Sequence, residues 1–573
     1  MNAQRENKTK GALDSTDQRT GYSETLRTYY PLIVFFALLL LLSFLNLYPQ
    51  AAYPLRGLFI VSGIALISMI ILCLGYGTSR IKKEGVISIA LYALFLLWCL
   101  ARGRFSPVPS MGRPYLALVL EGFWILASVQ IVLSLERAPG ASQERPFGIP
   151  YSRKNSFSLD DLSLRSLVFL YFILLTLIAC LYGIYQYFIG YNQQLEVLSD
   201  IYKEQDQLSR SIVHALKERR ISARFGNPNL LAAFLSTTLP FLLFTFIRRK
   251  TIFKGKGLGV KLFFAGTGAI LVFVLILTQS RGGFLSFIFS GLLFLFLYLI
   301  YSGQSHLKAP GQLTQLVKKA LSITAVLFIL AFIFILIQNA TRTPDMRGGS
   351  FLERLFRAGT IRERMYYIET GWKIISENPI FGTGPAGYEL YYPQFRSFGA
   401  REAKYAHNFI IQMGSELGLV GLALFFLFVV HHIRIAIHSI RRKPEILVFF
   451  SAALIFLFNS LFEYGFYHDS LYLNFCLCMG LIAGVYAPED IVKRGRRASY
   501  SLLSMRYYLY FALPVVVSFL LIPGLVIKPF YSAYQAQIGD DFVLDGDQEK
   551  ALRYYRKAVQ IQGDNPWHHQ RLG

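Results

Sequence analysis

Cysteine is scarce in this chain, and the few cysteines lie among apolar residues. The 573 residues include five, each inside an apolar run: Cys73, Cys99, Cys180, Cys476 and Cys478. A thiol in such surroundings behaves as a small hydrophobic side chain. No pair or cluster has the spacing of a disulfide framework or of a metal site. The sequence therefore predicts neither disulfides nor a bound metal, and we expect no cofactor.

Acidic side chains are also few. Aspartate and glutamate number 34 against 58 lysines and arginines, which gives a formal net charge of +24. In a soluble protein this excess would suggest nucleic-acid binding. Here 54% of the residues are hydrophobic, and many apolar runs reach the roughly 20 residues that cross a bilayer. Basic residues of such proteins collect in cytoplasmic loops. We therefore predict a polytopic protein that contacts membrane lipids and no nucleic acid.

The N-terminal segment lacks the apolar core of a cleavable signal peptide. Residues 1–30 are mostly polar and hold no apolar run, whereas a signal peptide carries an apolar stretch of about 7–15 residues. We expect these residues to form a disordered cytoplasmic tail. The transmembrane domain is then predicted at 31–529, and a separate segment at 530–573.

The apolar runs predict an all-α fold, a transmembrane bundle of about 13 helices. The predicted spans are 31–49, 57–76, 85–101, 115–134, 167–190, 230–247, 261–279, 283–301, 319–337, 409–431, 446–463, 469–487 and 507–529. An odd number of spans puts the two termini on opposite sides of the membrane.

The charge distribution predicts that the N-terminus is cytoplasmic and the C-terminus lies outside. In that orientation the cytoplasmic connections carry the basic stretches: Arg80-Ile81-Lys82-Lys83, Arg145 to Lys154, Arg248-Arg249-Lys250 with Lys254 and Lys256, Lys318-Lys319, Arg441-Arg442-Lys443 and Lys493 to Arg497. The short outer connections near 50–56, 280–282 and 464–468 carry almost no basic residue. Short loops are where the positive-inside rule applies, so the reverse topology would violate it repeatedly.

Two outer segments are long enough to carry structure of their own. Residues 191–229 have apolar positions at helical spacing, which predicts an amphipathic helix at the interface. The loop 338–408 is about 70 residues long, and loops of this length are usually functional or disordered. Because it contains a helical pattern at 361–375 and the turn Gly382-Thr383-Gly384-Pro385, we expect it to be ordered.

Arg281, Arg364 and His407 all fall on the predicted outer side, at span ends or in the long loop. The planar guanidinium of arginine pairs bidentately with phosphate and keeps its charge. Histidine titrates near neutral pH and can act as a general base. Their convergence suggests a site for an anionic, lipid-linked substrate. Glu463, His468 and Asp469 cluster at the outer end of the predicted spans 446–463 and 469–487. They are either further polar contacts to a substrate or ordinary loop residues.

Each of these side chains also has an ordinary structural explanation. Arg281 could snorkel to the interface, Arg364 could belong to a solvated helix face with Arg362 as its rival, and His407 could be an interfacial histidine.

Four further polar residues leave similar alternatives open. Arg224 could bind phosphate or cap the following span, and Asn229 could serve a helix start, as could Asn227. Glu416 is expected inside a span, where an acidic residue is usually paired and could orient an arginine.

Four short segments give the chain a likeness to a known family. They are Arg224-Phe225-Gly226-Asn227-Pro228-Asn229, Ser280-Arg281-Gly282-Gly283, the stretch from Arg364 to Glu377-Asn378-Pro379-Ile380-Phe381-Gly382-Thr383-Gly384, and Ala406-His407-Asn408 followed by Gly414 to Gly421. In this order the chain resembles the O-antigen ligase and polymerase family of bacterial inner-membrane glycosyltransferases over residues 220–480. Tyr366 and Tyr367 stand where the family typically has tryptophan.

The resemblance implies transfer of a glycan from an undecaprenyl-diphosphate carrier to an acceptor at the periplasmic face, without metal. It implies that Arg281 and Arg364 bind the diphosphate and that His407 activates the acceptor hydroxyl. Arg224, Asn229, Arg362, Glu416 and Glu463 are the further candidates for substrate binding. The acceptor could be lipid A-core, a second carrier-linked repeat unit or a protein. A transporter or flippase is the alternative from another class. It predicts charged residues at mid-membrane and repeated halves, whereas this sequence shows no internal symmetry and its polar residues gather at one face.

The C-terminal residues have the spacing of a tetratricopeptide repeat. The matching positions are Ile538-Gly539, Phe542, Gly546, Ala551, Tyr555 and Ala558, and the pattern restarts at Pro566-Trp567 and runs to Leu572-Gly573. Such repeats normally need about three copies for stability. This partial repeat therefore either belongs to a longer array or packs on the membrane domain. It could bind a periplasmic protein, and the simpler alternative is an amphipathic helical hairpin.

Overall fold

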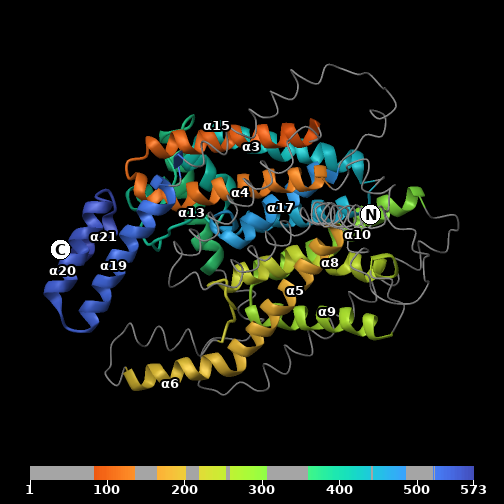
Figure 1. The fold of residues 1–573 in the computed structure, drawn as a ribbon, viewed down its shortest axis with the longest axis horizontal. Coiled ribbons are helices and arrows are strands. Elements are labelled where there is room, and N and C mark those ends of the chain that lie inside the picture. The colour runs from red at the N-terminus through yellow and green to blue at the C-terminus, as the bar shows by residue number, and fades with distance from the viewer. Residues whose placement is uncertain are drawn as a thin grey trace, which may run out of the picture.

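All regular secondary structure in the described part of the chain is helical (Figure 1). The computed structural model describes residues 83–135, 164–201, 219–252, 258–305, 359–440, 443–485, 520–521 and 523–572. The prediction of an all-α fold is confirmed for these residues.

Nine of the predicted spans fall in the described residues, and each is a helix. These are α3 (Lys83–Arg104), α4 (Pro109–Leu135), α5 (Leu164–Tyr185), α8 (Pro228–Ile252), α9 (Leu258–Thr278), α10 (Arg281–Ser305), α15 (Phe409–Ser439), α16 (Glu445–Asn459) and α17 (Asp469–Val485). Among them α3, α4, α5, α8, α10 and α15 are long and apolar enough to cross a membrane, and the apolar parts of α9, α16 and α17 are shorter. The predicted spans 31–49, 57–76 and 319–337 lie outside the described residues, as does 507–529 apart from its last residues. The total of 13 therefore stays a prediction.

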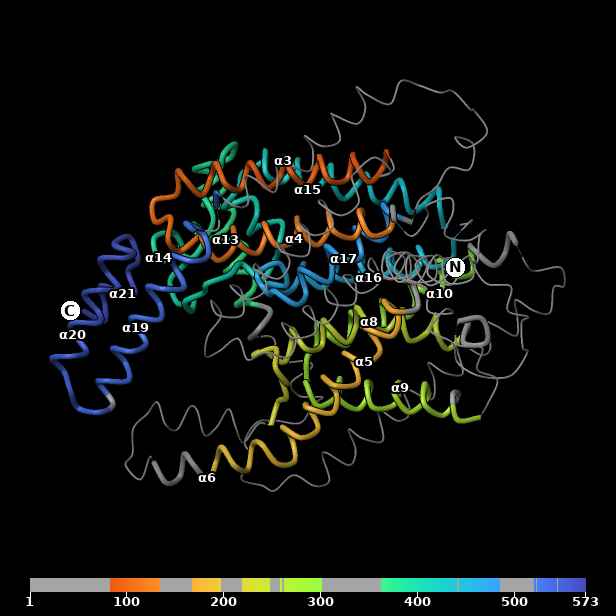
Figure 2. The backbone as a smooth tube through the Cα atoms, in the orientation of Figure 1, coloured from red at the N-terminus to blue at the C-terminus, as the bar shows by residue number. Residues whose placement is uncertain are grey.

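The apolar stretch of α4 is fully buried, and α4 packs mainly against α17 and α3. In Figure 2, α3 and α15 run side by side along one edge, α4 and α17 form the middle, and α5, α8 and α9 form the other edge. The cores of these layers are large aromatic and aliphatic side chains, among them Trp124, Phe169 and Phe241.

Small residues let α8 and α10 approach closely. Ser236 Oγ of α8 donates to the carbonyl of Gly283 at 3.2 Å, and Ser290 Oγ of α10 donates to the carbonyl of Ser236 at 2.8 Å. A side chain at Gly283 would put its Cβ only 2.2 Å from the Cβ of Ala232. Small residues and interhelical hydrogen bonds of this kind are typical of packing between membrane helices.

Gly283→Ala is expected to destabilise the bundle because the new methyl group has no room against α8. Overpacking of this kind costs about 1–3 kcal/mol, which thermal unfolding of the detergent-solubilised protein should detect as a lower melting temperature. Gly282→Ala is the matched control, since a Cβ there would meet nothing closer than Phe462 Cβ at 4.0 Å. Equal melting temperatures for the two variants would contradict this account of the contact.

A break in α15 shapes the bundle at the end where α15 begins. Gly418 has φ 69° and ψ −174°, which is not helical. The break frees carbonyl and amide groups that a continuous helix would pair internally, and such groups must find partners at membrane depth. The amides of Thr383 and Gly384 donate to the carbonyls of Ser415 and Glu416, both at 2.8 Å.

The remaining freed groups near Gly418 also find partners. Trp98 Nε1 of α3 donates to the carbonyl of Leu417 at 2.9 Å. In the other direction, the amide of Leu419 donates to the carbonyl of Pro379 at 2.9 Å. Residues 379–384 and Trp98 thus complete the hydrogen bonding of the broken helix.

The described part of the long loop is ordered, as predicted. The helical pattern at 361–375 lies within α13 (Gly359–Glu377), and a further helix, α14 (Gly387–Phe395), was not predicted. Ile374, Tyr388 and Tyr392 form a small second core with neighbouring residues of the loop and of α15. Residues 338–358 lie outside the described part of the chain.

The predicted outer helix within 191–229 is present as α6 (Tyr191–Ile201), which continues α5 through the π-helical turn η2 (Gln186–Gly190). In Figure 1 it leaves the bundle at an angle. Residues 202–218 are not described, so the predicted amphipathic character beyond Ile201 stays a prediction.

The C-terminal residues form a helical hairpin, α19 (Lys528–Leu544) and α20 (Gln548–Ile561), followed by α21 (Pro566–Leu572). Tyr555 packs against Gly539, where a Cβ would lie 2.5 Å from its ring. The connection between α20 and α21 rests on α4, since Ser110 Oγ donates to the Asp564 carbonyl at 2.6 Å and Arg113 pairs with the Asp564 carboxylate at 3.1 Å. Of the two arrangements expected, the segment therefore packs on the membrane domain. Its assignment to a repeat family stays a prediction.

Candidate active site

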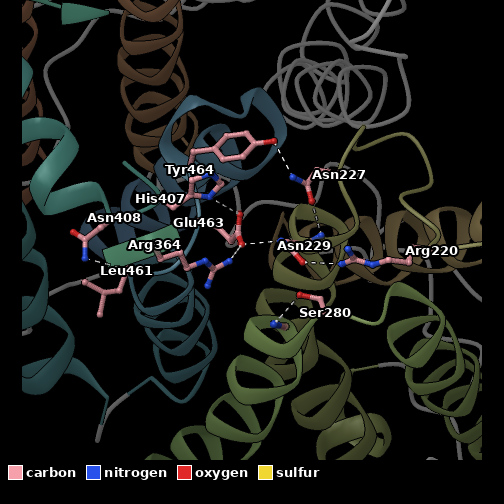
Figure 3. A network of polar contacts seen from close by, with 11 residues as sticks. Arg220, Asn227, Asn229, Ser280, Arg364, His407, Asn408, Leu461, Glu463 and Tyr464 are labelled. Atoms are coloured by element: carbon pink, nitrogen blue, oxygen red, sulfur yellow. Dashed lines mark hydrogen bonds and ion pairs between the residues drawn. The ribbon is translucent and has the colours of Figure 1, made fainter. Parts of the chain in front are cut away.

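Glu463 lies at the centre of a polar network where several helices begin or end. It follows α16, and its side chain is 5% exposed. One carboxylate oxygen, Oε1, accepts from Arg364 Nη2 and from Asn229 Nδ2, the latter at 2.8 Å. The other, Oε2, lies 3.3 Å from His407 Nδ1 (Figure 3). Three side chains from distant segments thus meet at the Glu463 carboxylate.

Each partner is held by the local structure of its segment. Asn229 lies in the first turn of α8, which Asn227 caps by accepting from the Asn229 amide at 2.8 Å. Pro228, as the first helical residue, fits this start because its missing amide hydrogen would have had no partner. Asn408 caps α15, and its Nδ2 donates to the carbonyl of Leu461 at 3.2 Å. The helix-start role predicted for Asn227 is confirmed.

His407 is held in a conformation that a non-glycine residue seldom adopts. Its φ is 51°, and such strained residues persist only where their surroundings hold them, often at functional sites. Its ring stacks on Tyr367 at a centroid distance of 5.5 Å and meets Tyr464 edge-on at 5.3 Å. Because a carboxylate only accepts, Nδ1 is the nitrogen that donates to Glu463, so in the neutral ring Nε2 keeps its lone pair. This is the tautomer that a general base requires.

A small pocket opens beside this histidine. It is lined by His407, Asn408, Phe409, Gln412, Met413, Glu463, Tyr464, Phe466 and Tyr467. The candidate base and the carboxylate that orients it therefore face the same space.

Arg281 opens α10 at the same end of the bundle and is half-buried. A Cβ at the next residue, Gly282, would lie 4.0 Å from Phe462 Cβ, so the turn that carries Arg281 adjoins the turn that carries Glu463. Ser280 Oγ accepts from the Gly283 amide at 3.1 Å and caps the helix (Figure 3). Of the two glycines after Arg281, Gly283 is explained by the close approach of α8.

The electrostatic character of this end favours an anion. The N-termini of α8, α10 and α15 all lie beside the network. Helix N-termini carry partial positive charge and attract anions. They add to the positive charge of Arg364, whose guanidinium is paired with the Glu463 carboxylate, and of Arg281 at the start of α10.

Two of the predicted binding residues lie away from these contacts. Arg362 is exposed on α13, whereas Arg364 on the same helix is half-buried and bonded to Glu463. Arg224 lies over the ring of Tyr182, with its guanidinium carbon 4.6 Å from the centroid.

Glu416 and His468 have structural partners. Glu416 is buried in α15 and accepts from Gln412 Nε2 at 2.8 Å and from the Tyr467 hydroxyl, so no arginine is among its recorded partners. His468 stacks on Phe225 at 5.4 Å. Burial lowers the pKa of His468 to about 4, which leaves its ring neutral near pH 7. Of the cluster at 463–469, Glu463 therefore joins the network and His468 packs in the core.

One residue of the network was not anticipated from the sequence. Arg220 Nη2 donates to Asn229 Oδ1 at 3.3 Å, and its Nε donates to the carbonyl of Thr278 at 3.2 Å (Figure 3). It stands next to another arginine, Arg219, and nothing in the sequence separates the two.

One part of the chain matches a known protein family. Residues 266–426 match the O-antigen ligase family. This O-antigen ligase domain runs from α9 into α15 and includes Arg281, Arg364 and His407. Asn229 and Glu463 lie outside it, although their side chains meet its residues. The family implies glycan transfer of the ligase or polymerase type, with lipid-linked glycan substrates. None of the curated proteins matches the chain.

A metal ion in a protein is usually held by several histidine, cysteine or carboxylate side chains. Within the described residues, no group of three or more histidine, cysteine, aspartate or glutamate side chains is arranged to hold one. The side chains that meet at the network carry guanidinium, imidazole, amide and carboxylate groups.

Proposed function

We propose that the protein transfers a glycan from an undecaprenyl-diphosphate carrier to an acceptor hydroxyl at the periplasmic face of the inner membrane, as an O-antigen ligase does. The observation that carries the proposal is the network at Glu463, in which Arg364 and His407 of the ligase domain share one carboxylate. A cation for the leaving group and a base for the nucleophile are thereby held a few ångströms apart.

The reaction needs one base and one stabilised leaving group. The acceptor hydroxyl attacks the anomeric carbon of the carrier-linked sugar, and His407 Nε2 takes the hydroxyl proton. The bond between the anomeric carbon and the diphosphate oxygen breaks, and undecaprenyl diphosphate leaves with the electron pair. The glycan is then linked to the acceptor oxygen, so atoms and charges balance without a further reactant.

Arg281 and Arg364 supply the charge that the leaving diphosphate requires. Each guanidinium can give two parallel hydrogen bonds to phosphate oxygens. Stabilisation of developing charge by such preorganised donors is often the largest catalytic contribution, with single donors worth roughly 3–4 kcal/mol. In this role the two arginines carry the electrostatic work, and no metal ion is required.

Glu463 has a positioning role in this scheme. Its Oε2 fixes the His407 tautomer, as the carboxylate of a catalytic triad fixes its histidine. Its Oε1 holds Arg364 while no carrier-linked glycan is bound. A diphosphate entering the site would compete for the same guanidinium, so the Arg364–Glu463 pair can hold the arginine ready until the carrier arrives.

Arg364→Lys is expected to reduce transfer by at least about a hundredfold, because lysine is a point charge and lacks the fork. Arg281→Lys should behave alike. Transfer is measured as release of undecaprenyl diphosphate in membranes supplied with the carrier-linked glycan of the same strain. Arg396→Lys, at an arginine paired with the exposed Glu402, is the matched control. Full activity of both Arg281→Lys and Arg364→Lys would exclude the diphosphate role.

The acceptor is distinguished by the glycans of a strain that lacks the protein. Carrier-linked polymer without capped lipid A-core would identify a ligase, and single repeat units would identify a polymerase. Loss of glycoproteins would identify a protein O-oligosaccharyltransferase, for which the hairpin α19–α20 offers a surface for a periplasmic protein partner. Unchanged surface glycans and glycoproteins would argue against glycan transfer and in favour of transport.

A further inference from the structure

Arg220 has no assigned role in the transfer just proposed, yet its side chain is tied into the network that would perform it. Its guanidinium joins two places, the carbonyl of Thr278 at the end of α9 and the side-chain oxygen of Asn229 at the start of α8. Thr278 lies three residues before Arg281, and Asn229 bonds directly to Glu463.

The amide group of Asn229 has two chemically different ends, and its partners fix which end faces which. Arginine can only donate, so Arg220 requires an acceptor and takes Oδ1. The Nδ2 end must then point the other way, where Glu463 Oε1 accepts it at 2.8 Å. With the amide reversed, two donors and two acceptors would face one another. Arg220 and Glu463 therefore fix the orientation of the Asn229 amide together, and Arg220 anchors its oxygen end.

The backbone that presents Arg220 is held independently of its side chain. Gln186, the first residue of the π-helical turn η2, accepts from the amides of Ser222 and Ala223 at 3.0 and 2.8 Å. The Tyr191 hydroxyl donates to the backbone carbonyl of Arg220 at 2.5 Å. π-helical turns are often found at functional sites. Because these contacts use only backbone atoms of the loop, they survive a change of the Arg220 side chain.

We propose that Arg220 is a positioning residue for glycan transfer, which acts through Asn229 to hold Glu463 in the orientation that serves Arg364 and His407. This inference rests on the proposed function. Loss of Arg220 leaves the Asn229 side chain held at its nitrogen end only, so that it can leave the position in which Nδ2 reaches Glu463. Glu463 then shifts, and with it the imidazole and the guanidinium that it holds.

Arg220→Met is expected to lower the transfer rate about tenfold to a hundredfold, the loss that corresponds to one charge-assisted hydrogen bond. The fall should appear in kcat, with KM for the carrier-linked glycan changed less than about threefold, because Arg220 does not touch the donor in this scheme. Arg220→Lys remains a pure donor and should retain most of the activity. Arg219→Met is the matched control, since Arg219 bonds to Asn192 on the neighbouring helix.

A double-mutant cycle with Asn229→Ala separates positioning from a general structural role. If Arg220 acts through Asn229, adding Arg220→Met to Asn229→Ala should cost nothing more, because strongly coupled residues are not additive. Activity is read as undecaprenyl diphosphate release from the carrier-linked glycan of the same strain, normalised to folded protein by thermal unfolding. If Arg220→Met lowers the activity as much in the Asn229→Ala background as in the wild type, the inference is wrong but the proposed function stands. The same holds if Arg220→Met alone keeps wild-type activity. An inactive wild-type protein would overturn the proposed function and the inference with it.

Discussion

Glu463→Ala should leave glycan transfer undetectable, a loss of about a thousandfold or more. The substitution removes the shared partner of Arg364, His407 and Asn229 in a single step. The imidazole then loses the group that fixes its tautomer, and the guanidinium loses the group that aims it. Losses at residues that act as a unit are of this order. Release of undecaprenyl diphosphate from the carrier-linked glycan measures it directly.

Glu463→Gln separates charge from shape in the same assay. Glutamine fits the space and can accept from one partner, but it is neutral and its amide nitrogen would face a donor on the other side. We expect an intermediate loss, with the protein still folded. Glu402→Ala is the control, because its side chain is 85% exposed and pairs only with the exposed Arg396 among the recorded contacts. Wild-type activity of Glu463→Ala would show that the network is structural and that the proposed site is wrong.

Gly418→Ala should destabilise the protein by about 4 kcal/mol or more. A side chain at this φ costs about 1–2 kcal/mol, and the new Cβ would lie 2.2 Å from the carbonyl oxygen of Ile380, a backbone atom. Residues 379–384 would have to move away, and the freed carbonyls of α15 would lose their donors. Losses of this size are rare and mark a defined structural cause. Thermal unfolding of the detergent-solubilised protein is the measurement.

Gly399→Ala isolates the conformational part of that loss. Gly399 also has a positive φ, 81°, but nothing lies within 4 Å of a Cβ placed there. Gly399→Ala should therefore lower the free energy of unfolding only by the strain of the left-handed conformation. If the two variants unfold at the same temperature, the contact between the break and residues 379–384 has little energetic weight.

The sequence predicted the elements of the fold better than their contacts. The apolar runs gave a helix at every predicted span that the structure describes, because a backbone in lipid must satisfy its own hydrogen bonds. The break at Gly418 was not predicted, since its partners lie about 35 residues earlier in the chain and no local pattern reports them. The short helix α14 was also missed, and it contains a proline that argues against a helix.

The site shows a similar division. The family segment that begins at Arg364 favours this arginine over Arg362. In the structure Arg364 contacts Glu463, whereas Arg362 is exposed. His407 could be proposed because its chemistry suits a base. Arg220 could not, because its importance comes from the orientation of an amide nine residues away, a relation that appears only when the loop is folded against α8.

The backbone hydrogen bonds between the broken helix α15 and residues 379–384 limit how the chain can vary in length. Because they pair backbone atoms, they constrain the number of residues on each side of Gly418 more tightly than their side chains. One residue inserted into 379–384 would put every donor out of step with its carbonyl. Residues 396–405 carry no such backbone pairing with α15 among the hydrogen bonds of the described residues, so insertions there can be accommodated while Arg364 and His407 keep their places. Residues 379–384, in one of the segments by which the chain resembles the family, thus serve as a fixed frame, and the neighbouring loop is freer to vary in length.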